Sequence, residues 1–214
     1  SAASDVYKRQ MLYYAPQAWT SDNSDAVERQ KIQYGTSMCY PLSSMGSHVS
    51  VVPNHQVNRV TPLHTRANTA YFGTFGYELD LGKLSAEEIA EVKDEIAFMK
   101  EYREIFQFGT FYRLQSPFEH NVMAWMCVSG DQKTAIVGWY RTLNRVNDRF
   151  ARVRLAGLLP DTLYEDSRSG ARCYGDELMH YGLITTDGTT GEPHPEDGLT
   201  TDFDSRLYVL KAVE

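Results

Sequence analysis

Side chains that could take part in acid–base or sugar chemistry gather within eleven positions near the start of the chain. They are Trp19, Thr20, Ser21, Asp22, Asp25, Glu28 and Arg29. Asp22 and Asp25 are three residues apart, and Arg29 lies four residues beyond Asp25. An aspartate paired with Arg29 would stay ionised. The other aspartate, beside Trp19 and a like-charged neighbour, would have a raised pKa that suits a general acid.

The same spacing also has a structural interpretation, which spacing alone favours. Ser21 or Asp22 would cap a helix, and Asp25 with Arg29 would form a surface pair one helical turn apart. Chemistry and capping therefore both remain open at this point.

The segments around this loop predict alternating strands and helices. "MLYYA" (11–15) predicts a buried strand that stops at Pro16, and "DAVERQKIQYGTSM" predicts a helix that ends at Gly35. "MCYPLSSMG" is a further strand candidate with a stop at Pro41, and "PLHTRANTAYFG" predicts a short helix. This order fits a βα-repeat architecture with a parallel sheet, in which active-site loops follow the strands.

Residues 85–107 predict a long amphipathic helix. Ser85 and Glu88 have the spacing of a capping box, and Gly109 is a natural stop. A stripe continues along the segment at periods of three and four through Ile89, Val92, Ile96, Met99 and Arg103 to Phe106.

The pattern changes after this helix, where short β-type runs alternate with turn signals. They are "TFYRLQ", "AWMCVSG", "TAIVGWYRTL", "RFARVRLAGL", "TLYED", "RCYGDELMHYGL" and "SRLYVLKAV". This spacing predicts an antiparallel sandwich of about seven or eight strands. "TTDGTTGEPHPEDGLTTD" predicts a long exposed loop. We expect domains at 11–107 and 108–214, preceded by a leader (1–10) that does not look native.

Composition limits the partners. The net charge of −7, with interspersed signs, argues against nucleic acid. Cys39, Cys127 and Cys173 show no metal or disulfide spacing, and no run approaches the roughly 18 apolar residues of a membrane span. We therefore expect a cytoplasmic protein without metal or cofactor.

Single residues outside the polar loop favour structural roles. Cys39 and Cys127 are expected to be buried, and Trp125 and Trp139 to pack in the core. His48 and His55 are more readily explained as hydrogen-bonded structural histidines than as catalysts.

A resemblance to a known family favours a chemical role for the polar loop over a purely structural one. "YYAPQAWTSDNSDAVERQKIQYGTS" closely resembles the acid/base region of bacterial α-galactosidases of glycoside hydrolase family 36. The family pattern Ser-Asp-x-x-Asp-x-x-x-Arg is met by Ser21, Asp22, Asp25 and Arg29. The likeness continues through "SSMGSHVSVVPNHQVNRVTPLHTRANTAYFGTFGYELDL", "FQFGTFYRLQSPFEHN", "YGDELM" and "SRLYVL", and covers nearly all of 11–214.

The resemblance implies a fold of two parts, a partial (β/α)8 TIM-barrel sector followed by an antiparallel β-sandwich domain. It implies that Asp22 is the acid/base of a retaining α-galactosidase, which uses two carboxylates to release terminal α-galactosyl residues. The other residues of the loop would have supporting roles. Trp19, Thr20 and Ser21 would line the galactose subsite, and Asp25 and Arg29 would support it. Raffinose- or melibiose-type oligosaccharides would be substrates of a homo-oligomer.

The sequence departs from the family pattern in one important respect. The family nucleophile lies in a Lys-Trp-Asp motif, and no tryptophan of this chain has those neighbours. We therefore expect a fragment that carries the acid/base without the nucleophile and that is inactive alone. The alternatives are a non-catalytic carbohydrate-binding or structural β-sandwich module, and an α-galactosyl transglycosylase of the same fold.

Overall fold

The computed structural model describes residues 13–145, 152–185 and 202–213. The chain divides into two compact units, Ser1–Gln107 and Phe108–Glu214, and each is considered by itself. The expected leader at 1–10 lies outside the described residues, as does almost all of the expected loop at 185–202. Within the described part, no helix combines the length and the apolar character that a membrane crossing requires.

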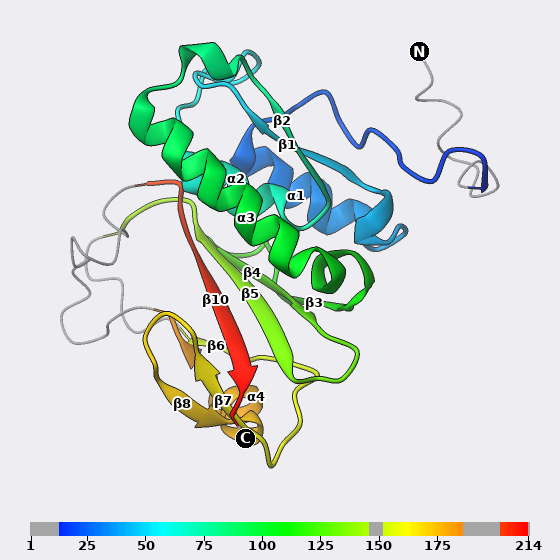
Figure 1. The fold of residues 1–214 in the computed structure, drawn as a ribbon, viewed down its shortest axis with the longest axis vertical. Coiled ribbons are helices and arrows are strands. Elements are labelled where there is room, and N and C mark those ends of the chain that lie inside the picture. Colours follow the sequence, from blue (N-terminus) through cyan, green and yellow to red (C-terminus); the bar gives the residue numbers. More distant parts are fainter. Residues whose placement is uncertain (1–12, 146–151, 186–201, 214) are drawn as a thin grey trace. The chain divides into compact units, whose positions relative to one another are not determined.

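The first unit is built from helices around a short parallel sheet (Figure 1). Its elements are α1 (Ala26–Thr36), a 3-10 turn (Leu42–Ser44), β1 (Gly46–Ser50), α2 (Leu63–Ala70), β2 (Thr74–Glu78), a second 3-10 turn (Leu81–Lys83) and α3 (Ala86–Phe108). β1 and β2 pair in parallel, from Gly46 opposite Thr74 to Ser50 opposite Glu78, with α2 in the connection. A parallel pair needs such a crossover, because the chain must return to the same end of the sheet.

A third segment runs parallel to β1 just before the polar loop. The Ala18 amide donates to the Ser44 carbonyl over 2.8 Å, and the Gly46 amide donates to the Ala18 carbonyl over 2.9 Å. The predicted buried strand at 11–15 is wrong in its described part, since Tyr13 and Tyr14 are 86% and 79% exposed. The contact with β1 begins only beyond Pro16, whose ring nitrogen cannot donate to a ladder.

The predicted strand at 38–46 is also displaced. The segment forms turns and a 3-10 helix before β1 begins at Gly46. Both the amide and the hydroxyl of Ser44 donate to the Pro41 carbonyl, over 3.0 and 2.8 Å, and these local bonds replace a ladder. Cys39 lies exposed in this region, so the prediction that it is buried is wrong.

The predicted long helix is confirmed as α3. The Ser85 amide donates to Glu88 Oε2 over 2.8 Å, and the Glu88 amide donates to Ser85 Oγ over 3.2 Å, as a capping box requires. The buried residues follow a stripe of Val92, Glu95, Met99, Tyr102 and Phe106. This stripe includes a carboxylate and leaves out Ile89 and Ile96, so it is rotated from the predicted one.

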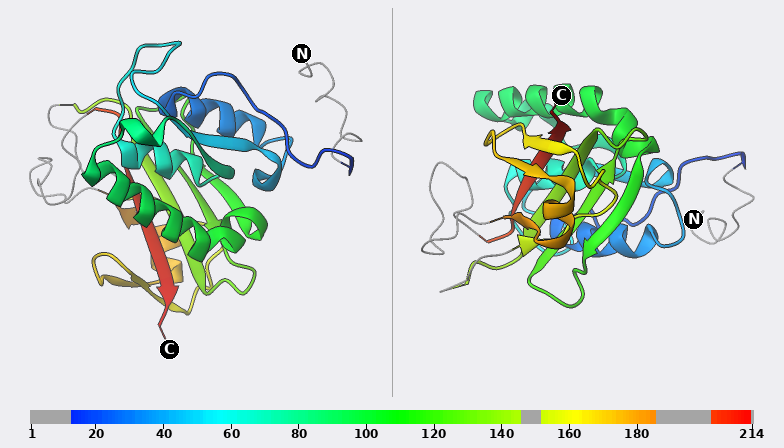
Figure 2. Two further views of the ribbon diagram at one scale, coloured as in Figure 1. Left: turned by 45° about the horizontal axis from the view of Figure 1, so that its top comes forward. Right: turned by 90° about the horizontal axis from the view of Figure 1, so that it is seen from below.

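The second unit is dominated by one antiparallel sheet with the order β3-β4-β5-β10-β7-β8 (Figures 1 and 2). Its strands are β3 (Thr110–Gln115), β4 (Val122–Val128), β5 (Thr134–Arg141), β7 (Leu163–Asp166), β8 (Arg172–Tyr174) and β10 (Asp204–Ala212). β10, red in Figure 2, comes last in the chain and lies between β5 and β7. The predicted antiparallel pairing is confirmed.

A smaller layer covers one face of this sheet. It contains the pair β6 (Arg152–Val153) and β9 (Leu183–Ile184) and the helix α4 (Gly175–His180). Together with the sheet it encloses the core, formed among others by Ala124, Met126, Val137, Trp139, Leu155, Leu158, Tyr164, Leu178 and Leu210. The described second layer is therefore a strand pair and a helix, where the sandwich prediction expected a full second sheet.

Two sequence predictions for this unit have clear outcomes. Trp125, Trp139 and Cys127 are fully buried, as expected. The run at 172–183 was expected to be a strand, and its start does form β8. The chain then turns into α4, where Glu177 accepts from the Tyr174 amide over 2.8 Å at the start of the helix. Gly175 is required there, since a Cβ would come within 2.1 Å of the Leu159 carbonyl oxygen.

Candidate active site

The polar loop connects the parallel segment at Ala18 to the first turn of α1. Thr20 Oγ1 donates to the Gly46 carbonyl over 3.2 Å, which ties the start of the loop to β1. At its end, Asp25 accepts from the amides of Val27 and Glu28 over 3.1 and 3.0 Å. The helix cap is therefore Asp25, and the prediction that Ser21 or Asp22 caps the helix is wrong. At the other end, Gly35 lies inside α1.

Asp22 lies exposed between two anchored neighbours. On one side, the Ser21 carbonyl accepts from Arg29 Nη1 over 3.4 Å, and the Ser21 hydroxyl accepts from the Asn23 amide over 3.1 Å. On the other side, Asn23 Oδ1 accepts from the Asp25 amide over 3.1 Å. The backbone on both sides of Asp22 is thus fixed, while its carboxyl group stays accessible.

Arg29 is buried beneath the loop, with 4% of its surface exposed. Its guanidinium donates to the carbonyls of Ser21 and Gly46 and, over 3.2 Å, to Gln33 Oε1. Burial lowers the pKa of Arg29 to about 10, an effect that nearby Glu78 opposes, so the group stays charged at neutral pH. Arg29 therefore acts as a three-way donor to backbone and amide oxygens, and the expected surface pair with Asp25 does not form.

Asp25 instead binds Arg59, which lies between β1 and α2. The same guanidinium lies 3.8 Å from Glu28 Oε1. A second contact joins the two loops, because Asn54 Nδ2 donates to Ser24 Oγ over 3.4 Å. Sequence reasoning missed Arg59, and no local signal could have found it, since 34 residues separate it from Asp25.

Gln33 joins α1 to the rest of the unit from a fully buried position. Its Nε2 donates to the carbonyls of Thr69 and Phe72 over 3.0 and 2.9 Å, and its Oε1 accepts from Ser47 Oγ over 2.9 Å and from Arg29. Each buried polar atom of this amide has partners, which fixes α1 against β1 and α2.

The indole of Trp19 stacks on the imidazole of His48, with ring centroids 4.5 Å apart and planes inclined by 31°. Trp19 is 49% exposed, and His48 of β1 is half-buried. Burial lowers the pKa of His48, so its ring is neutral at pH 7. His55, the other candidate histidine, is exposed.

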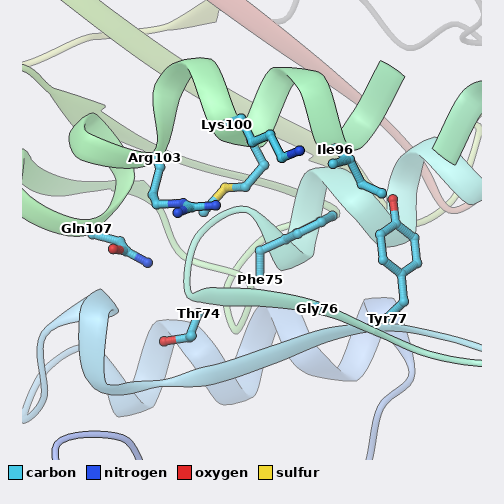
Figure 3. A pocket seen from close by; sticks show the side chains of 9 residues that line it. Thr74, Phe75, Gly76, Tyr77, Ile96, Lys100, Arg103 and Gln107 are labelled. Carbon is cyan, nitrogen blue, oxygen red and sulfur yellow. The ribbon is translucent and has the colours of Figure 1, made fainter. Parts of the chain in front are cut away.

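A cavity of about 420 Å³ lies apart from the polar loop, between β2 and α3. Figure 3 shows Phe75 and Tyr77 extending from β2 toward the helix, with Lys100 and Arg103 on the helix side. The lining residues are Thr74, Phe75, Gly76, Tyr77, Ile96, Met99, Lys100, Arg103 and Gln107, so no predicted site residue belongs to it. Among the described residues β2 pairs only with β1, and its other edge carries no strand.

Over the part of the chain that the structure describes, no group of histidine, cysteine, aspartate or glutamate side chains is arranged to hold a metal ion. The chemistry that the loop itself offers is the proton chemistry of an accessible carboxyl group on a fixed backbone.

Two family models match the chain. The model described as Melibiase matches residues 3–109, and the model described as the glycosyl hydrolase family 36 C-terminal domain matches residues 122–210. By these matches the chain falls in the class of glycosyl hydrolases, enzymes that cleave glycosidic bonds.

Individual relatives agree with this class. The α-galactosidase AgaA of Geobacillus stearothermophilus is 50% identical over 95% of this chain and 26% of its own length. Mel36A of Lactobacillus acidophilus is 44% identical over 94% of this chain and 26% of its own length. The crystal structure of AgaA matches with a TM-score of 0.87, covering 95% of this chain and 27% of that one. The chain belongs to glycoside hydrolase family 36, and it spans about a quarter of the length of these α-galactosidases.

Proposed function

We propose that the chain is part of a retaining α-galactosidase in which Asp22 is the general acid/base. The observation that carries this proposal is the position of Asp22, exposed on a fixed loop directly after a parallel strand segment, in a family 36 chain. Active sites of parallel βα-barrels lie at this end of their strands.

We further propose that residues 11–107 are a sector of a (β/α)8 barrel. The parallel order of the Ala18 segment, β1 and β2, with helices between them, supports this. The free edge of β2 and the neighbouring cavity in Figure 3 are where a further strand and helix would pack.

In the first chemical step, the Asp22 carboxyl group protonates the glycosidic oxygen while a carboxylate nucleophile attacks the anomeric carbon. In the second step, the Asp22 carboxylate takes a proton from water, which attacks the same carbon and releases galactose. Retaining enzymes hold the two carboxyl groups about 5–5.5 Å apart. The 214 residues contain no Lys-Trp-Asp motif, so the nucleophile would come from sequence outside them.

The neighbours of Asp22 have supporting roles in this proposal. Trp19, Thr20 and Ser21 line the galactose subsite, while Arg29 and the pair of Asp25 and Arg59 hold the loop. Crystal structures of AgaA variants contain raffinose or stachyose, which supports α-galactoside oligosaccharides as substrates here. The active form would be a homo-oligomer.

A hybrid enzyme tests the proposal, because the chain covers about a quarter of AgaA at 50% identity. This hybrid is AgaA with the present chain in place of its matching segment. We expect it to release galactose from raffinose, and we expect the isolated 214-residue chain to release none. Asp22→Asn should abolish release by the hybrid, whereas Asp94→Asn, the same change at an exposed position of α3, should not.

Two results would contradict the proposal. One is a folded hybrid, with the circular dichroism and hydrodynamic size of AgaA, that leaves raffinose intact. The other is a hybrid whose Asp22→Asn variant is as active as its Asp94→Asn variant. Chromatography of the products separates hydrolysis, which gives free galactose, from transfer to a second sugar.

A further inference from the structure

His48 lies in a space that two glycines leave open on one face of the sheet. Gly46 is two residues before His48 on β1 and so lies on the same face, and Gly76 of β2 is its partner in register. A Cβ on Gly76 would come within 3.2 Å of His48 Cδ2, and one on Gly46 within 3.5 Å of His48 Cε1. A side chain at position 76 would crowd the imidazole, and one at position 46 would be in ordinary contact with it, so Gly76 in particular leaves room for the ring.

The imidazole uses this room to support Trp19. The two rings are in stacking contact, and Trp19 still exposes about half of its surface. Trp125 and Trp139, by contrast, are fully buried. The indole is thus held from one side and accessible from the other, three residues before Asp22 in the fixed loop.

An accessible aromatic face suits the apolar C–H face of a pyranose ring, and its usefulness depends on a fixed orientation. We propose that His48 is a positioning residue, which holds the Trp19 indole in the orientation that stacks against the sugar bound beside Asp22. This inference rests on the proposed α-galactosidase function and deepens it, because it assigns sugar affinity to a side chain of β1 outside the acid/base loop.

The imidazole suits this role for two further reasons. Its lowered pKa keeps it uncharged at neutral pH, so no buried positive charge is added beside Arg29. Thr20, the residue after Trp19, is bound to the Gly46 carbonyl on the same strand. The hydrogen bond from the Thr20 hydroxyl and the ring contact therefore fix Trp19 to β1 together.

The first arm of the test uses the 214-residue chain and needs no catalysis. Trp19 is the one accessible tryptophan, and all three tryptophans of the chain lie in the described part. Acrylamide quenching of the fluorescence therefore reports on its indole. We expect His48→Ala to increase quenching and His48→Phe to restore it, while His55→Ala, at an exposed histidine, leaves it unchanged. Equal quenching of His48→Ala and the unsubstituted chain would overturn the supporting contact.

The second arm measures raffinose hydrolysis by the hybrid enzyme. The contact between two aromatic rings contributes a free energy that corresponds to about a 2- to 10-fold change in affinity. His48→Ala should therefore raise KM by about 2- to 10-fold with kcat changed less than about 2-fold, and His48→Phe should restore KM. An unchanged KM in His48→Ala, together with a raised KM in Trp19→Ala, would overturn the inference and leave the proposed function intact. A folded hybrid without any turnover would instead overturn the proposed function, and the sugar contact with it.

Discussion

Asp25 binds Arg59, 34 positions further along the chain, although Arg29 lies only one helical turn away. The carboxylate is almost fully buried and also caps α1, so a single side chain joins the polar loop, the helix start and the loop after β1. This relationship determines how the loop that carries Asp22 is held.

Removing Arg59 should therefore destabilise the first unit. Arg59→Ala leaves a buried carboxylate without its cation, and we expect the free energy of unfolding to fall by about 2 kcal/mol. Urea unfolding of the whole chain, followed by circular dichroism, measures this. Lys31→Ala is the matched control, because Lys31 also contacts Glu28 but in a partly exposed pair, and it should change the free energy of unfolding by less than about 0.5 kcal/mol. Equal effects of the two substitutions would count against a special role of Arg59.

Asp22→Ala should show the signature of a missing acid/base. In the hybrid enzyme, kcat for raffinose should fall by about 10²- to 10⁴-fold. An aryl galactoside with a strongly acidic phenol should still form the galactosyl-enzyme, because its leaving group needs no proton. Sodium azide should then accelerate turnover and give α-galactosyl azide, identified by NMR. Formation of the β-azide would assign Asp22 the role of nucleophile instead.

Glu95 should make the stability of the first unit depend on pH. Burial raises the pKa of Glu95 to about 7, although the hydrogen bond from Tyr77 over 2.6 Å opposes the shift. The folded state therefore holds a proton that the unfolded chain, with an ordinary glutamate, gives up near pH 4.5. The stabilisation is complete below that pH and is lost as the pH rises toward 7.

Urea midpoints between pH 4.5 and 8 measure this effect. Glu95→Gln should reduce the fall of the urea midpoint with rising pH. Glu104→Gln, at an exposed position of the same helix, should leave that fall unchanged. The prediction fails if the Glu95→Gln variant keeps the slope of the unsubstituted chain.

Gln33→Leu should be among the more damaging single changes in the first unit. The substitution leaves the carbonyls of Thr69 and Phe72 and the Nε of Arg29 without their buried partner. We expect a loss of about 3 kcal/mol in unfolding free energy, against less than about 0.5 kcal/mol for Gln56→Leu at an exposed loop position. Calorimetry of the two variants under one buffer condition compares them directly.

Thiol labelling should distinguish the cysteines. Cys39 is exposed, while burial raises the pKa of Cys127, which is completely enclosed, and also that of Cys173. Because the thiolate is the reactive form, we expect one rapid equivalent with a maleimide at pH 7, located at Cys39 by peptide mapping. Cys39→Ser should remove that phase, and a rapid phase that persists would contradict the exposure.

The sequence predicted best where the determinants are local. The capping box of α3 needs only Ser85 and Glu88, and these residues meet in the structure as their spacing indicates. The buried stripe of the same helix was harder to predict, because Glu95 replaces an apolar residue and depends on Tyr77 of β2.

The polar loop shows the limit of spacing arguments. Several residues between Ser21 and Asp25 have side chains that can cap a helix, and local propensity does not select among them. Asp25 is selected by Arg59, which arrives from another loop. The stacking of Trp19 on His48 likewise joins residues that only the parallel pairing brings together.

The hydrogen bonds of Arg29 limit which amino acids position 29 tolerates. Its three nitrogens point to oxygens from three different segments, so the direction of each N–H matters as much as the positive charge. A lysine would conserve the charge but offers a single nitrogen, which cannot reproduce three N–H bonds that point in different directions. Homologous enzymes that keep this loop should therefore exchange lysine and arginine freely at partly exposed sites such as Lys31, yet keep arginine at position 29.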